Sequence, residues 1–473
     1  MQDRHRAPKM QRFWLLWLAL LLTLALGGCA SSGEKAAGQT PKNIVILFAD
    51  GAAATQWDFG NYASRILRGQ PFATTDVVFR GGVLGLMSTH PHGPYVTDSA
   101  AAASAMSTGH KVENGAVSIT PDGRPQRTLM QAAKAAGKRI GMVTTATVYD
   151  ATPAAFSINL KSRRDYQAAV RSYLDLEPDV LLGGGAEYFL PAPAGKRKDG
   201  QDLIAAFRAK GHQVVRNSAE LGAASGPRLL GLFADQDMAF ELDRDPAREP
   251  TTAEMTTAAL QALSQQNANG FVLLVENENV DTAAHQSDAA SLMRALWAID
   301  DAVRIALEYQ RRNPDTLVIV TGDHETGGFS ATYALKDLKT RSSSNRFYAG
   351  EAQLRMLAAI TVSLARARDM LGKKPTADGL DKLVAAHFPG FSLDEDLRRL
   401  IVERKTDERN FNYLPQSALG RMVARQTGFY WGTSGHTTEP VAVGAIGPGA
   451  ERFRGYQDNT DFGKHLHGLL QPR

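Results

Sequence analysis

The sequence predicts an α/β protein built on a doubly wound, mostly parallel sheet flanked by helices. Three observations favour this class. Short apolar runs, typical of buried strands, alternate along the chain with longer segments of helical spacing. Two clusters of acidic and histidine residues directly follow two of these runs, where ligands bind in such sheets. The composition is that of an ordinary globular protein, with 43% hydrophobic and 22% charged residues among 473.

Residues 1–28 are predicted to be a signal peptide. Four basic side chains precede the apolar run 13–26, which is short for a membrane span but suits an export signal. The sequence Leu-Gly-Gly-Cys at 26–29 resembles a bacterial lipobox and predicts lipidation of Cys29, the only cysteine; an incidental thiol is the alternative. We therefore expect an exported lipoprotein in the periplasm or at the cell surface, anchored in the outer membrane, without an intramolecular disulfide.

Residues 29–41 are predicted to form a lipidated tether, because 30–39 is rich in alanine, serine and glycine. Loss of residues 1–28 removes four basic residues and one acidic residue from a formal charge of +4, which leaves +1. The high pI of about 9.0 therefore belongs mostly to the leader. No basic surface for nucleic-acid binding is expected.

Residues 42–330 and 427–473 are assigned to one α/β catalytic domain. Apolar residues at helical spacing predict its helices at 128–136, 166–176, 202–209, 252–265 and 289–311. Since helices and strands alternate, the sheet is predicted to be parallel. Its strands are expected at 43–48, 139–143, 179–182, 229–233, 271–275, 317–320 and 441–446.

Residues 331–426 are predicted to be a helical insert. The segments 351–370, 379–387 and 393–404 have helical spacing, and no strong strand pattern accompanies them. Such an insert can cap an active site. A surface elaboration or a dimer contact explains it equally well.

Two strand ends carry a metal-ligand signal. Asp323 and His324 directly follow one predicted strand, and the segment 276–285 directly follows another. Carboxylate and imidazole together are a good donor set for zinc. Since neighbouring side chains of a strand point to opposite faces, Asp323 and His324 can share an ion only where the backbone turns. The two clusters together predict one shared site.

Two further motifs belong to the same edge of the sheet. The first predicted strand ends at Asp50, and Ser99 precedes an alanine-rich helical stretch. A helix N-terminus favours phosphate or a developing serine alkoxide. For this motif alone, the simpler reading is that Asp98 or Ser99 only caps the helix.

Six motifs follow one another along the chain: Asp50-Gly51, Thr97-Asp98-Ser99-Ala100-Ala101, the segment Asp150 to Ala155, the segment Glu276 to His285, Asp323-His324 and Ser434-Gly435-His436-Thr437. Taken in order, these motifs resemble those of the alkaline phosphatases over roughly residues 42–330 and 427–450. Each is weak alone, but their order and spacing are highly specific. Phosphodiesterases and sulfatases share the wider superfamily, and the phosphomonoesterase branch is the best match.

The resemblance implies two zinc ions and one magnesium ion per chain. Magnesium prefers oxygen ligands and retained waters, which suits the third set of residues. The implied ligands are Asp281, His285 and His436 for one zinc, Asp323, His324 and one oxygen of Asp50 for the other, and the second oxygen of Asp50 with Thr152 and Glu276 for magnesium, with Asp150 beside that site.

The resemblance also implies the reaction. Ser99 is the expected nucleophile and forms a phosphoserine intermediate, and Arg163, eleven residues after Thr152, is the expected phosphate-binding arginine. Hydrolysis of a phosphate monoester then releases inorganic phosphate. Because water on zinc is more fully deprotonated at higher pH, an alkaline optimum is expected.

One residue departs from the family pattern. Many bacterial relatives have a lysine, and others a histidine, where this chain has Thr282 near the magnesium site. We expect weaker retention of the phosphate product here. A surface lipoprotein that binds metal or phosphate without turnover is the remaining alternative class, and a nucleophile beside the metal ligands argues against it. The natural substrate stays open, and so does the choice between a monomer and a homodimer, the form common among relatives.

Overall fold

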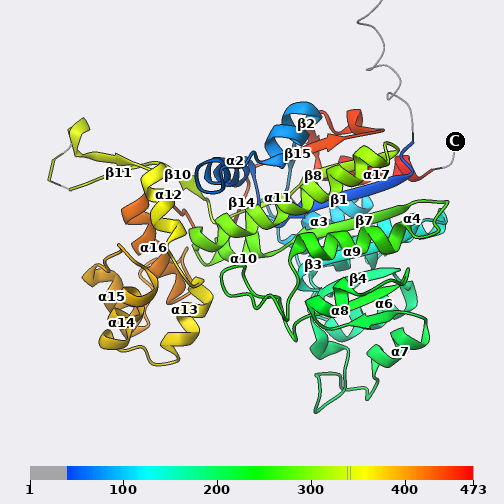
Figure 1. The fold of residues 1–473 in the computed structure, drawn as a ribbon, viewed down its shortest axis with the longest axis horizontal. Coiled ribbons are helices and arrows are strands. Elements are labelled where there is room, and N and C mark those ends of the chain that lie inside the picture. The colour runs from blue at the N-terminus through cyan, green and yellow to red at the C-terminus, as the bar shows by residue number, and fades with distance from the viewer. Residues whose placement is uncertain (1–39, 338, 341, 472–473) are drawn as a thin grey trace, which may run out of the picture. The chain divides into compact units, whose positions relative to one another are not determined.

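The computed structural model describes residues 40–337, 339–340 and 342–471 (Figure 1). The predicted leader, the tether and Cys29 lie outside the described residues. Within the described ranges, no helix combines the length and the apolar character that crossing a membrane requires.

Ten strands of the described chain form one sheet (Figure 1). Seven of them match the strands expected from the sequence. The other three escaped prediction because they are short or lack a continuous apolar run. In spatial order the strands are β16 (Gly455–Asp458), β2 (Val83–Ser88), β15 (Val441–Ile446), β8 (Thr316–Thr321), β1 (Asn43–Ala49), β7 (Phe271–Asn277), β3 (Arg139–Thr147), β4 (Val180–Gly184), β6 (Leu229–Leu232) and β5 (Gln213–Val215).

The sheet is parallel except at β15. This strand pairs antiparallel with both β2 and β8. The prediction of a mostly parallel sheet is confirmed, and the sequence pattern did not predict the direction of the strand at 441–446. The reason for this direction lies in the preceding chain. A short strand β14 (His436–Thr437) pairs with β9 (Glu325–Thr326), which closely follows β8. The chain therefore enters β15 from the carboxyl rim of the sheet and has to run back across it.

Helices cover both faces of the sheet. In β1, Val45 and Leu47 pack into one apolar core, and Ile44 and Ile46 pack into the other. Alternation of side chains along a strand thus supplies both cores. The first core includes α2 (Ala54–Ala63), α9 (Thr252–Ser264) and α11 (Ala289–Arg312), and the second includes α3 (Ser99–Thr108), α4 (Leu129–Ala135), α5 (Ala151–Ser157), α6 (Tyr166–Leu176), α7 (Leu203–Ala209) and α17 (Asn459–Leu470).

The segment predicted as an insert contains five helices, coloured yellow to orange in Figure 1. The single helix expected at 351–370 is broken, because Ser363 caps a new helix and its backbone N–H and hydroxyl bind Asp243. A small hairpin, β11 (Tyr333–Leu335) with β12 (Arg346–Tyr348), precedes the helices. They are α12 (Glu351–Ala358), α13 (Leu364–Leu371), α14 (Ala377–His387), α15 (Glu395–Glu403) and α16 (Gln416–Thr427).

Candidate metal and phosphate site

The carboxyl ends of three neighbouring strands position the acidic side chains. β1 lies between β7 and β8, and Phe48 of β1 is in register with Glu276 and with Thr321. Asp50, Glu276 and Asp323 therefore come together at one rim of the sheet. All three are at most 1% exposed. The prediction that ligands gather beyond these strand ends is consistent with this register.

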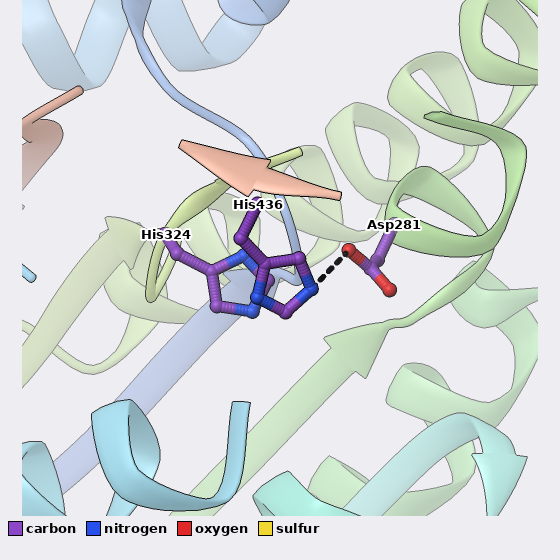
Figure 2. A group of neighbouring side chains, drawn as sticks. All are labelled: Asp281, His324 and His436. Carbon is purple, nitrogen blue, oxygen red and sulfur yellow. Dashed lines mark ion pairs between the residues drawn. The ribbon is translucent and has the colours of Figure 1, made fainter. Parts of the chain in front are cut away.

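Two groups of candidate metal ligands share His324. One contains Asp50 and Asp323, and the other contains Asp281 and His436; in each group the ligand atoms lie within 4.8 Å of one another. Figure 2 shows the second group, in which the imidazoles of His324 and His436 stack with their centroids 3.6 Å apart. Nitrogen and carboxylate donors at this spacing suit zinc.

His285 joins the second group from α10 (Asn279–His285). Its Nε2 lies 3.0 Å from Asp281 Oδ2 and 3.2 Å from His436 Nε2. Asp281 and His285 are one helical turn apart, which places both on one face of α10, as the sequence predicts. The three expected ligands of one zinc are thus neighbours.

Backbone carbonyls orient two of these histidines. His285 Nδ1 donates to the carbonyl of Ser434 at 2.6 Å, and His436 Nδ1 donates to the carbonyl of Thr97 at 2.8 Å. Because a carbonyl only accepts, each Nδ1 carries the proton. The two Nε2 atoms therefore face each other, and a proton or a cation is needed between them. This arrangement is typical of metal-binding histidines.

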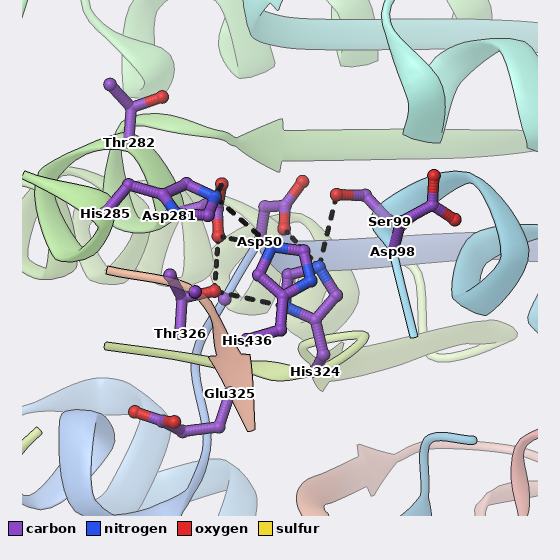
Figure 3. A network of polar contacts seen from close by, with 12 residues as sticks. Asp50, Asp98, Ser99, Asp281, Thr282, His285, His324, Glu325, Thr326 and His436 are labelled. Atoms are coloured by element: carbon purple, nitrogen blue, oxygen red, sulfur yellow. Dashed lines mark hydrogen bonds and ion pairs between the residues drawn. The ribbon is translucent and has the colours of Figure 1, made fainter. Parts of the chain in front are cut away.

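Thr326 orients the third histidine and was not predicted. Its hydroxyl donates to Asp281 and so accepts from His324 Nδ1, 3.2 Å away. His324 Nε2 is left to face Ser99 Oγ at 3.1 Å and Asp50 Oδ1 at 3.4 Å (Figure 3). One threonine thus connects Asp281 with the histidine that both ligand groups share.

Glu325 was also missed by the sequence analysis. Its buried carboxylate accepts hydrogen bonds from Gln56, Thr437 and the backbone of the turn after β9. It therefore holds the Asp323-His324 turn against β14, which carries His436. No motif marks Glu325 or Thr326, although both lie next to the predicted ligands. Their roles depend on partners distant in the sequence.

Four buried oxygen atoms of the predicted site residues lack hydrogen-bond partners in the described part of the chain. Asp50 Oδ1, Thr152 Oγ1, Glu276 Oε1 and Asp323 Oδ2 are buried, and none has a hydrogen-bond partner among the described residues. Unpartnered buried polar atoms are costly, so a bound cation would stabilise them. A set made only of oxygens fits magnesium. Thr152 and Glu276 are two of the ligands that the resemblance implies for magnesium, whereas Asp50 Oδ1 and Asp323 Oδ2 face His324 Nε2 at 3.4 and 3.3 Å.

Burial and the nearby negative charges make ionisation of three of these carboxyl groups less favourable. Burial and the neighbouring Asp323 and Asp281 raise the pKa of Asp50 well above its ordinary value. Burial raises the pKa of Glu276 to about 8, and burial with repulsion from Asp281 raises that of Asp323 to about 7. Burial opposes a charge on His285, but Asp281 overcomes it and raises the histidine's pKa to about 9. Protons thus partly neutralise the metal-free cluster.

Ser99 is the first residue of α3 and is 4% exposed. Asp98 caps the helix by accepting from the backbone N–H of Ala101 at 2.9 Å. The capping role considered for this motif therefore belongs to Asp98. Ser99 instead directs its hydroxyl at His324, as Figure 3 shows.

Arg163 lies on the same side of the site. Its guanidinium forms ion pairs with Asp98 at 3.4 Å and with Asp150 at 3.2 Å. Burial opposes its charge, but Asp150 and Asp98 raise the pKa of Arg163 above its ordinary value. The neighbouring Arg164 makes no side-chain contact of this kind among the described residues. The two aspartates hold the fork of Arg163 ready for an anion.

We predict that the metal-free protein loses thermal stability as pH rises from 7 to 9. The folded pKa values of Glu276 and His285, about 8 and 9, exceed the ordinary values of 4.5 and 6.5. The folded state therefore holds protons in this range that the unfolded state has released, and their loss destabilises it. Calorimetry with a chelator should show a falling midpoint. Zinc with magnesium should flatten the slope, and equal slopes with and without metal would contradict this explanation.

Comparisons with known proteins agree with the geometry. The family model described as alkaline phosphatase matches residues 41–471. Alkaline phosphatase 4 of Bacillus subtilis is 30% identical over 91% of this chain and 89% of its own length. The repressible alkaline phosphatase of Saccharomyces cerevisiae is 30% identical over 96% of this chain and 85% of its own.

A solved structure resembles the whole fold. The crystal structure of Thermus thermophilus alkaline phosphatase superposes with a TM-score of 0.83 and 31% identity, covering 94% of this chain and 97% of that one. The match in fold and the match in sequence span the same residues as the site described above. This chain belongs to the alkaline phosphatase family.

Proposed function

We propose that this chain hydrolyses phosphate monoesters through a phosphoserine intermediate on Ser99. The observation that carries the proposal is the position of Ser99 Oγ. It lies 3.1 Å from His324 Nε2, inside the shared ligand cluster and at the N-terminus of α3. The guanidinium of Arg163 lies on the same side and forms ion pairs with Asp98 and Asp150. A nucleophile, an anion-binding fork and metal ligands together suit phosphoryl transfer.

Two zinc ions and one magnesium ion are proposed as cofactors. The mixed nitrogen and oxygen donors favour zinc, and the oxygen-only group favours magnesium. When bound, these ions would supply Lewis acidity toward the serine, the leaving oxygen and the attacking water. The proposed ligands are Asp281, His285 and His436 for the first zinc, Asp50, Asp323 and His324 for the second, and Asp50, Thr152 and Glu276 for magnesium.

The protein's own residues account for two displacement steps. Ser99 Oγ attacks phosphorus and the bond from phosphorus to the alcohol oxygen breaks, which leaves phosphoserine. Water then attacks phosphorus, the bond to Ser99 breaks, and inorganic phosphate leaves. Arg163 can bind two of the phosphoryl oxygens that neither attack nor leave in either step. Because the attacking water has to lose a proton, we propose that turnover rises toward alkaline pH.

The first experiment compares p-nitrophenyl phosphate with bis-p-nitrophenyl phosphate as substrates for the chain from residue 30, loaded with zinc and magnesium. We expect the monoester to be preferred. Ser99→Ala should lower kcat for it by at least about a hundredfold, because the covalent step is lost. Unchanged zinc content would show that the variant keeps the site. Preference for the diester would instead favour a phosphodiesterase. If Ser99→Ala left the activity unchanged, a phosphoserine intermediate on Ser99 would be ruled out.

Thr282 distinguishes this site from the lysine-bearing relatives. Its hydroxyl donates to the carboxylate of Glu278. Burial and the neighbouring Asp237 and Asp281 raise the pKa of Glu278 well above its ordinary value. Where those relatives have the charged lysine, this chain thus has the neutral hydroxyl of Thr282 beside acidic side chains. We propose that the phosphate product is held less tightly as a result.

Thr282→Lys should lower the inhibition constant of inorganic phosphate by about fivefold, since a partly exposed charge pair contributes on the order of 1 kcal/mol. Thr282→Val is the matched control: it removes the same hydroxyl without adding charge and should leave the constant within about twofold. Competitive inhibition assays at constant metal concentration measure both. An unchanged constant in the lysine variant would sink this explanation.

We also propose that the chain is exported and anchored through a lipid on Cys29, on the strength of its leader and lipobox alone. The full-length chain expressed in a bacterium should then fractionate with the outer membrane. Cys29→Ser should be found in the soluble periplasmic fraction, because a lipid chain supplies the membrane affinity. Identical fractionation of the two proteins would count against lipidation.

A further inference from the structure

The two halves of the metal site differ in their access to solvent. The side chains of Asp50, Asp323 and His324 are at most 1% exposed. By contrast, the side chain of His285 is 22% exposed and that of His436 is 11% exposed. Solvent therefore reaches the site on the side of His285. If the chain acts as proposed above, the alcohol part of a substrate has to leave on this side.

An aromatic side chain from the insert flanks this opening. Tyr413 lies in the segment between α15 and α16, and its ring centroid is 5.8 Å from that of His285 at an interplanar angle of 31°. Tyr413 is 39% exposed, so part of it remains available to a ligand. Burial, Asp281 and Glu278 raise the pKa of its hydroxyl, as expected beside these carboxylates.

The segment that carries Tyr413 is attached to the site by Ser434. The backbone N–H of Ser434 donates to the carbonyl of Asn410 at 2.6 Å, and Ser434 Oγ accepts from the backbone N–H of Asn412 at 3.3 Å. The carbonyl of Ser434 is also the acceptor for His285 Nδ1. One residue thus holds both the metal-ligand candidate and the backbone next to Tyr413. The position of the ring relative to the site is therefore constrained.

We propose that Tyr413 is a specificity-determining residue that stacks against the alcohol part of the substrate, favouring phosphate monoesters of flat, ring-bearing alcohols. The inference rests on the proposed phosphatase activity and adds a substrate class to it. A half-exposed ring can gain contact area with a second ring at little conformational cost. An acyclic alcohol offers no such surface. This contact also gives the insert a role at the mouth of the site, the first of the two roles left open by the sequence.

The test compares 1-naphthyl phosphate with glycerol 2-phosphate, using the metal-loaded chain from residue 30. Tyr413→Ala should lower the ratio of kcat/KM for the aromatic ester to that for the glycerol ester by about threefold to tenfold, as expected for one aromatic pair. The loss should lie mainly in KM, because stacking stabilises the bound substrate and the transition state alike. Tyr413→Phe should retain the wild-type ratio, and Tyr413→Leu should lose it.

Tyr348→Ala is the matched control. Tyr348 is another exposed tyrosine of the insert, 60% exposed, and it pairs with Tyr333 in the β11–β12 hairpin. This variant should leave the ratio unchanged. Equal losses for both esters in Tyr413→Ala, or no loss for either, would overturn the proposal. If Tyr413→Ala lowered kcat/KM equally for both esters and also lowered the zinc content, the role of Tyr413 would instead be to hold His285 in place.

A binding measurement separates this inference from the proposed function. Calorimetry should show that phenylphosphonate binds more tightly than methylphosphonate, and that Tyr413→Ala abolishes most of the difference. Were the wild-type chain to hydrolyse neither ester, the proposed phosphatase activity would fail, and the two phosphonates would still decide the role of Tyr413. If the esters are hydrolysed but the phosphonates bind equally well, only the role of Tyr413 fails.

Discussion

Electrostatic repulsion among buried carboxylates is the constraint on which this structure depends. β1, β7 and β8 are parallel and in register, so the acidic residues that follow them have to meet at one rim. Asp50, Glu276, Asp281 and Asp323 are each at most 6% exposed there. Burial and this repulsion raise the pKa values of Asp50, Glu276 and Asp323, whereas the neighbouring histidines lower that of Asp281. Only protons or cations can relieve the repulsion. The three histidines turn their Nε2 atoms into the same space, and these atoms form a donor set suited to divalent cations once a proton no longer occupies them.

Residues outside the ligand set connect the parts of the site. Thr326 links Asp281 to His324, and Glu325 holds the turn after β8 against β14. Ser434 joins His285 to the insert. Thr326 and His324 are only two residues apart, but the bonds between Glu325 and Thr437 and between His285 and Ser434 join positions more than a hundred residues apart. A change at any of these positions would therefore shift the geometry of several ligands together, even though none of the three residues carries out the chemistry.

Much of this site could be predicted because its residues follow strong local patterns. Asp50, the 276–285 cluster and Asp323-His324 each come after a buried apolar run, so topology alone places them at one edge. Arg163 is different, since an arginine on the surface would look the same in the sequence. In the sequence only its spacing from Thr152 favoured it over Arg164, and the structure adds Asp98 and Asp150 as ion-pair partners of its guanidinium. The direction of β15 was unpredictable, because it depends on where β14 pairs.

The sequence by itself determined the class of fold, the family resemblance and the identity of the candidate ligands. Those features depend on local periodicity and on the order of motifs, which a chain carries regardless of how it packs. The tertiary structure decided which nitrogen of each histidine faces the centre, how the insert meets the site and which tyrosine flanks its opening. These features depend largely on contacts between separate segments, such as His285 with Ser434, which are 149 residues apart, and no local pattern encodes them.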